Sequence, residues 1–190
     1  MKRAMRLVRP VMSLDGAHLK SKWGGTLYVA SVKSACNEIY PVGFAIMNKN
    51  EDEAEWLWFL ELLRSTIDIL VMDHPRARVA YKYFSFISDR QKGLVNALQR
   101  VFPDNPCFCS IHLARDAETK GGKKIAKLVH SLSATFSGYE SRRCWAAIEQ
   151  VSPKGRAYLE SIPKEQWEGT AWIENPSLPP RFGIVTTNMS

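Results

Sequence analysis

The sequence contains no uninterrupted apolar run approaching the about 18 residues that suggest a membrane-spanning helix. Its start, Met1-Lys-Arg-Ala-Met-Arg6, is basic, but no apolar stretch of the kind found in secretory signals follows it. Internal repeats and low-complexity tracts are also absent. We therefore expect an intracellular soluble protein that is not secreted and has no membrane partner.

Cysteine is scarce, with four residues in 190. Without a secretory signal, such a small number favours reduced thiols over a disulfide framework. Two of the four, Cys36 and Cys144, stand apart from any other candidate ligand. We expect both to pack as small hydrophobic side chains.

Acidic residues are outnumbered by basic ones, 19 to 26, which gives a net charge of +7. This excess favours a polyanionic partner, because lysine and arginine displace counterions from phosphates. Runs of basic residues are also typical of ordinary solvated surfaces, so charge alone does not establish nucleic-acid binding. The hydrophobic content of 45% predicts a globular chain, and its length allows one full domain with a helical appendage.

The first 47 residues have the pattern of three strands. The run Arg9 to Asp15 alternates toward an acid and precedes Gly16, which predicts a strand that ends in a turn there. Strand-like runs follow at 26–32 and 39–47, separated by a short polar turn that favours antiparallel pairing. Pro41 cannot donate a backbone hydrogen bond, so we expect the third strand to lie at the edge of the sheet.

A helix follows, because the apolar residues Trp56, Phe59, Leu60, Leu63 and Ile67 recur with helical period. We expect Trp58 and Leu62 to widen this buried stripe. The next elements are a strand that begins at Phe84, a helix over 91–100 and a short strand over 107–110. From His112 onward the sequence is mainly helical, with a break at Gly121-Gly122.

Two acids, Asp15 and Asp89, stand at the ends of predicted strands. The predicted elements follow the order strand, strand, strand, helix, strand, helix. This order predicts an α/β ribonuclease-H-like fold, with a mixed sheet, flanking helices and a C-terminal helical region. Its first and fourth strands are neighbours, which would bring Asp15 and Asp89 together. Paired carboxylates bind Mg²⁺, which serves phosphodiester chemistry. The alternative for Asp89 is a structural role as the cap of the following helix.

Six sequence blocks resemble, in order, the catalytic domain of Mutator-like element (MULE) transposases. They are Leu14-Asp15-Gly-Ala-His-Leu-Lys20, Tyr40-Pro-Val-Gly-Phe-Ala-Ile46, Glu55-Trp-Leu-Trp-Phe-Leu60, Ile87-Ser-Asp-Arg-Gln-Lys-Gly93, Cys109-Ser-Ile-His112 and Thr186-Thr-Asn188. The resemblance implies a DDE-type site that uses Mg²⁺ or Mn²⁺ for DNA transposition. It also implies double-stranded DNA partners (transposon ends and target), a homo-oligomer in the active complex and a nuclear location in a eukaryote.

Carried over by residue, Asp15 matches the first catalytic acid of the family and Asp89 the second. Cys109 and His112 match the Cys-x-x-His element between the second and third acids. The third acid, a glutamate, follows the Thr-Thr-Asn block in the family as Thr-Thr-Asn-x-x-Glu, whereas the sequence given stops at Ser190. We therefore expect a truncated fragment with little strand-transfer activity, unless Glu168 or Glu174 substitutes.

The resemblance divides the chain into four parts. These are a basic N-terminal segment (1–10), the ribonuclease-H-like catalytic core (11–112), a helical insertion (113–182) and the beginning of the block that would carry the third acid (183–190).

Cys109 and His112 supply only two of the four ligands that tetrahedral Zn²⁺ needs. Cys107 is a possible third ligand, but its spacing from Cys109 differs from the usual zinc knuckle. We expect the Cys-x-x-His element to support the fold, with zinc binding as the alternative.

Three basic residues next to the acids are candidate DNA contacts. His18 follows Asp15, while Arg90 and Lys92 follow Asp89 at the start of a helix. Ordinary exposed charge is the other interpretation of all three.

Two further functional interpretations stay open. The chain could be a domesticated, non-catalytic DNA-associated regulator derived from a transposase. A cellular nuclease of the ribonuclease H superfamily would share the fold, but would not explain the Thr-Thr-Asn block or the Cys-x-x-His element.

Overall fold

The computed structural model describes residues 8–20, 22–47, 51–71, 84–104 and 106–187, with the side chains of 69–71 left out. The chain divides into two compact units. The first comprises Met1–Pro106, Pro179–Phe182 and Thr187–Ser190, and the second comprises Cys107–Leu178 and Gly183–Thr186. The sequence also predicts a helix end and a loop over 68–82, and residues 72–82 of this stretch lie outside the described residues.

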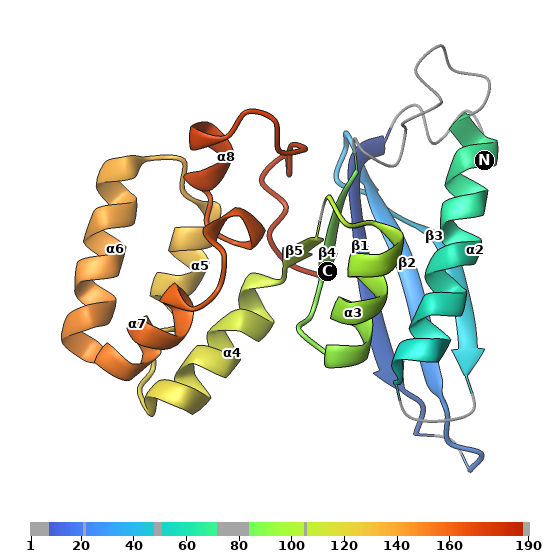
Figure 1. Cartoon of the computed structure of the whole chain (residues 1–190), viewed down its shortest axis with the longest axis horizontal. Helices are drawn as coiled ribbons and strands as arrows, with labels where there is room; N and C mark the ends of the chain where they lie inside the picture. The colour runs from blue at the N-terminus through green and yellow to red at the C-terminus, as the bar shows by residue number, and fades with distance from the viewer. Residues whose placement is uncertain (1–7, 21, 48–50, 72–83, 105, 188–190) are drawn as a thin grey trace. The chain divides into compact units, whose positions relative to one another are not determined.

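A mixed five-stranded sheet has the strand order β3-β2-β1-β4-β5 (Figure 1). Its strands are β1 (Val8–His18), β2 (Thr26–Ser34), β3 (Ile39–Met47), β4 (Ser85–Ser88) and β5 (Pro106–Phe108). The first three pair antiparallel, and β4 pairs parallel with β1. The predicted mixed α/β fold, with an antiparallel start and β1 beside β4, is therefore confirmed.

The predicted edge position of the third strand is also confirmed, since β3 is outermost in the order. Pro41 lies within β3 opposite Ser31, where the register shifts between Ala30 and Ser31. An edge strand tolerates both features, because one side of its backbone needs no partner strand.

Two helices cover one face of the sheet in the first unit (Figure 1). They are α2 (Glu53–Val71) and α3 (Lys92–Val101). The predicted helical stripe is buried, with Trp56 and Leu60 fully enclosed. Trp56 stacks on Tyr28 of β2 with ring centroids 3.9 Å apart. Burial and the hydrogen bond to Glu55 raise the pKa of the Tyr28 hydroxyl.

The prediction that Trp58 and Leu62 widen the buried stripe is wrong, because each is 50% exposed. Trp58 lies two residues from Trp56, which is about 200° around a helix. It therefore faces away from the sheet, and Leu62, one turn later, follows it. An apolar residue at the margin of a helical stripe does not have to be buried.

The second unit is helical. It contains α4 (Ser110–Gly121), α5 (Ala126–Ala134), α6 (Gly138–Val151), α7 (Pro153–Glu160), the 3-10 turn η2 (Lys164–Gln166) and the short α8 (Ala171–Glu174). Helix α4 packs on α5 and α7, and α6 packs on the same two helices. The predicted break at Gly121-Gly122 is confirmed, since Gly122 ends α4 with a φ of 67°.

The expectation that Cys36 packs as a hydrophobic residue is wrong, whereas Cys144 is buried as expected. Strand β2 ends at Ser34, and Cys36 lies exposed in the turn to β3. The hydroxyl of Ser34 accepts hydrogen bonds from the backbone N–H of Cys36 and Glu38. Cys107 and Cys109 are buried.

These exposures predict the reactivity of the four thiols. In the folded protein we expect one equivalent of thiol to react promptly with Ellman's reagent, and four to react in denaturant. Burial and the charge of Glu140 raise the pKa of the Cys144 thiol, while Arg143 lowers it. Since the thiolate is the reactive form, Cys144 should react slowly. Cys36→Ser should remove the prompt reaction, and a prompt phase that survived this substitution would contradict the assignment.

Candidate active site

Strand β1 carries Asp15 in its interior, so the prediction of a strand that ends at Asp15 is wrong. Pairing with β2 continues from Asp15–Val29 to His18–Thr26. The parallel ladder with β4 is shorter and runs from Val11–Ser85 to Ser13–Ile87. The antiparallel partner therefore keeps β1 extended three residues beyond Asp15, while the β4 ladder has already ended.

Asp89 follows the last residue of β4, Ser88. In a parallel ladder both chains advance together, so two residues beyond the Ser13–Ile87 pair lie Asp15 and Asp89. Neighbouring strands are about 4.8 Å apart. The register thus places the two acids level with each other on adjacent segments. This agrees with the prediction that the first and fourth strands are neighbours.

Asp89 is not the N-cap of the next helix. Gln91 has that position, and its side-chain oxygen accepts from the backbone N–H of Leu94 at 2.7 Å. One carboxylate oxygen of Asp89 accepts from the backbone N–H of Gln91 at 3.0 Å. This hydrogen bond fixes the direction of the Asp89 side chain, and Gln91 caps the helix.

A third acid, Glu51, lies beside Gly16, the residue after Asp15, and no motif in the sequence indicates it. A Cβ atom built on Gly16 would overlap the Glu51 carboxylate. Burial and the charge of Asp89 raise the pKa of Glu51; Asp15 adds to this rise, and His18 opposes it.

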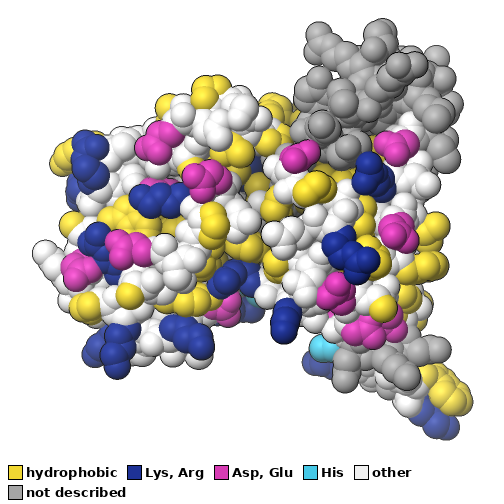
Figure 2. All heavy atoms as spheres, viewed as in Figure 1, with side chains coloured by type: hydrophobic (Ala, Val, Ile, Leu, Met, Phe, Trp, Pro, Cys, Tyr) yellow, Lys and Arg dark blue, Asp and Glu magenta, His cyan; other side chains and the backbone are white. Residues whose placement is uncertain are grey.

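The basic candidates flank the acids. His18 is the last residue of β1, and its Nδ1 lies 3.2 Å from Oγ1 of Thr26. Lys92 is exposed at the first position of α3, and Arg90 is partly buried between Asp89 and Gln91. Whether they contact DNA stays a prediction. On the face in Figure 2, basic and acidic side chains are interspersed, so the excess positive charge forms no single patch there.

The Cys-x-x-His element belongs to the second unit. Cys109 is buried and directly precedes α4, and its carbonyl accepts from the N–H of Leu113. The predicted strand over 107–110 ends at Phe108, since Ser110 already begins α4. The backbone N–H of Ser110 donates to the carbonyl of Val185 at 2.8 Å. The chain just before the Thr-Thr-Asn block is thus attached to this element.

Glu168 and Glu174, the two candidates to substitute for the family's third acid, also lie in the second unit. Glu168 is 1% exposed, and its Oε1 accepts from Ser141, Trp145 and Thr170. It is thus engaged as an internal hydrogen-bond acceptor. Glu174, at the end of α8, is exposed. The predicted place of the family's own third acid follows Ser190, the last residue of the sequence given.

The donor chemistry of the acid pair fits Mg²⁺ or Mn²⁺, which prefer carboxylate oxygens. Among the residues that the structure describes, no three acids, histidines or cysteines converge closely enough to hold a metal ion. Zinc at Cys109 and His112 stays an untested alternative.

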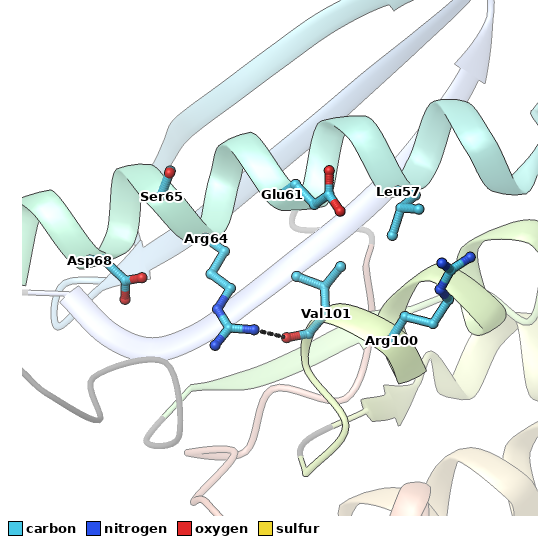
Figure 3. A pocket seen from close by; sticks show the side chains of 7 residues that line it. All are labelled: Leu57, Glu61, Arg64, Ser65, Asp68, Arg100 and Val101. Carbon is cyan, nitrogen blue, oxygen red and sulfur yellow. Dashed lines mark hydrogen bonds between the residues drawn. The ribbon is translucent and has the colours of Figure 1, made fainter.

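A hollow beside α2 is a different feature from the acid pair. It has a volume of about 380 Å³ and is lined by Leu57, Glu61, Arg64, Ser65, Asp68, Arg100 and Val101 (Figure 3). Arg64 donates across it to the carbonyl of Val101 at 3.0 Å. Its lining carries both signs of charge and includes none of the predicted site residues.

The strand order, the parallel β1–β4 pairing and the level acids define a ribonuclease-H-like α/β domain. A family model described as the MULE transposase domain matches residues 11–116, more than half of the chain. The chain therefore belongs to the MULE transposase domain family, which indicates a transposase-related function and an interaction with DNA. No curated protein sequence matches it. Among the described helices, none has the length and apolar character needed to cross a membrane.

Proposed function

We propose that the first unit is the core of a DDE-type DNA transposase that cleaves DNA and transfers strands with the help of Mg²⁺ or Mn²⁺. The observation that carries this proposal is the register of β1 and β4, which sets Asp15 level with Asp89. Membership in the MULE family supports it. The proposed partner is double-stranded DNA, namely transposon ends and target.

Asp15 and Asp89 would hold the ion in this proposal. Such an ion, when bound, supplies positive charge that stabilises the developing charge on a phosphodiester and activates a water or a 3′-hydroxyl. The protein's own contribution is to position the acids. Asp15 is fixed by the β1–β2 ladder, and Asp89 is oriented by the N–H of Gln91.

The positive charges near the acids have a separate role in the proposal. Lys92 and Arg90 stand at the start of α3, where backbone N–H groups point toward an approaching anion. Contacts to phosphate fix the position of DNA without reading its sequence. These residues would therefore hold the backbone of the substrate next to the acid pair.

The proposal predicts a loss of metal binding when either acid is neutralised. We expect the 190-residue chain to bind Mn²⁺, observed as loss of the electron paramagnetic resonance (EPR) signal of free Mn²⁺. Asp15→Asn and Asp89→Asn should each weaken binding by at least about tenfold, because each removes a charged ligand oxygen. Asp104→Asn, an exposed acid beyond α3, is the matched control and should bind as the wild type does.

Folding of each variant is checked by circular dichroism. If both site variants kept wild-type Mn²⁺ affinity while remaining folded, the proposed function would be wrong. The same conclusion would follow if the wild type bound no Mn²⁺ at millimolar concentration.

A further inference from the structure

A groove between α4 and α5 has a volume of about 640 Å³, which lies in the range of ordinary ligand sites. The two helices pack on each other within the second unit (Figure 1). Every residue that lines the groove belongs to one of these helices, and none belongs to the acid pair. The groove is therefore a feature of the helical unit alone.

The lining of the groove combines apolar surface with positive charge. Ile111 and Ala114 of α4 and Ala126 of α5 supply the apolar part. Arg115 of α4 and Lys127 of α5 line the same groove, and both are exposed. Within the described part of the chain, neither of these two side chains pairs with an acid. Each helix thus contributes one cation that a bound anion can neutralise.

The acid in the lining, Glu118, is engaged at the start of α5. Its Oε1 accepts from the backbone N–H groups of Ile125 and Ala126, each at 2.8 Å. The positive end of the α5 dipole partly balances this charge. The other acid of α4, Asp116, accepts from the Tyr158 hydroxyl at 3.2 Å, and α5 carries no acid. The acids of this helix pair therefore have donors of their own.

His130 of α5 adds a hydrogen-bonding group whose ring is held in place. Its Nδ1 lies 2.9 Å from the hydroxyl of Ser110, the fully buried first residue of α4. The imidazole itself is exposed and lines the groove. With the serine hydroxyl as the donor, Nε2 carries the ring proton and can donate to an anion. An anchored side chain loses little conformational freedom when it binds a ligand.

The connection between the two helices adds further positive charge next to the groove. Residues 119–127 contain no acid, and Lys120, Lys123 and Lys124 are all exposed. The cations beside α6 and α7 differ, because Arg156 there pairs with two glutamates. A series of cations without acidic partners favours a polyanion, since each cation displaces a counterion from a phosphate.

We propose that the α4–α5 groove binds the phosphodiester backbone of double-stranded DNA. Arg115 and Lys127 contact phosphate oxygens from the two sides of the groove, His130 donates from Nε2, and the apolar part of the lining meets the sugars. Such contacts position DNA without reading its sequence. Family membership, which indicates an interaction with DNA, favours this partner over an acidic protein segment. The proposal goes beyond the acid pair, because it gives the helical unit a role that needs no metal ion.

The test measures binding of the 190-residue chain to a fluorescently labelled DNA duplex of mixed sequence, followed by anisotropy in EDTA. Salt is varied from about 50 to about 200 mM. Arg115→Gln and Lys127→Gln should each reduce the slope of log affinity against log salt by about 0.9, because each removes one phosphate contact. The two substitutions together should weaken binding at least about tenfold at the lowest salt. His130→Ala should weaken it about threefold, the loss of one hydrogen bond.

The matched control removes one arginine and one lysine from exposed positions outside the groove. Arg143→Gln on α6 and Lys154→Gln on α7, combined in one variant, lower the net charge as much as the groove pair does. We expect this variant to change affinity less than about twofold, because salt screens distant charges. Circular dichroism verifies that every variant is folded, and the substituted side chains are all exposed.

The outcomes separate this proposal from the proposed function, since the groove variants should keep wild-type Mn²⁺ binding. Weaker duplex binding in the groove variants, with the control pair unaffected, supports the proposal. Equal losses in the groove pair and the control pair would show that only net charge matters and would overturn it. Wild-type duplex affinity in all groove variants, or no duplex binding by the wild type, would do the same. Lost binding to polyglutamate with unchanged duplex binding would assign the groove to an acidic protein instead.

Discussion

Trp56→Ala should lower the free energy of unfolding of the first unit by about 3–5 kcal/mol, in the range for large aromatic side chains removed from a core. Trp56 is fully buried, stacks on Tyr28 and meets Phe59 edge-on at 6.0 Å. It joins α2 to the central strands. Its indole N–H has no hydrogen-bond partner within the described residues, so the predicted loss comes from packing alone.

Trp58→Ala is the matched control, because it removes the same side chain from the half-exposed side of the same helix. We expect it to change stability by less than about 1 kcal/mol. Trp56→Phe should fall between the two, since it loses apolar area but also removes a buried, unsatisfied donor. Urea unfolding followed by circular dichroism measures all three. Equal losses for Trp56→Ala and Trp58→Ala would contradict the assigned helix orientation.

The outline of the fold could be predicted because it depends on periodic patterns. Alternation in the first strands and the helical spacing of Trp56, Leu60 and Leu63 identify elements that bury one side. Pro41 marked the edge strand through a simple hydrogen-bond argument. These features depend on a few neighbouring residues, which is why the sequence alone reveals them.

The wrong predictions concern positions whose environment is set by distant residues. Strand β1 runs beyond Asp15 because β2, a dozen residues later, continues to pair with it. Cys36 is exposed because Ser34 holds a tight turn through its hydroxyl. Local composition indicates neither the length of a partner strand nor the conformation of a turn.

Glu51 was missed for a related reason. It stands in a polar stretch that resembles a connecting loop, and no motif or spacing distinguishes it from Glu53 or Glu55. Its place depends on a glycine 35 residues earlier and a glutamine 40 residues later. Asp15 and Asp89, by contrast, follow apolar runs, and that signal is visible in the sequence.

The acid pair and Glu51 are positioned by different kinds of contact. Asp15 and Asp89 depend on the sheet register, which the central β1–β4 pairing determines. Glu51 depends on contacts between a loop and the start of α3, made by Gln91 and Gly93. A substitution of Gln91 should thus displace Glu51 without altering the sheet, because the backbone N–H that binds Asp89 is kept.

Glu168→Ala should lower the free energy of unfolding of the second unit by about 3 kcal/mol or more. One oxygen of this buried carboxylate accepts from the Ser141 hydroxyl at 2.6 Å, the Trp145 indole at 3.1 Å and the Thr170 hydroxyl at 3.0 Å. Hydrogen bonds to a charged group contribute about 1.5–3 kcal/mol each, and buried donors left unpaired add a penalty. Lys164 lies 3.6 Å from the other oxygen.

Glu165→Ala removes a neighbouring exposed glutamate and should change stability by less than about 0.5 kcal/mol. Glu168→Gln keeps an acceptor oxygen for the three donors but loses the charge, so its effect should be intermediate. Hydrogen exchange followed by mass spectrometry gives a local readout, with peptides from α6 exchanging faster in Glu168→Ala. If those peptides and the unfolding midpoint stayed at wild-type values, Glu168 would not be the structural centre of this unit. The three donors to its buried carboxylate would then contribute little to stability.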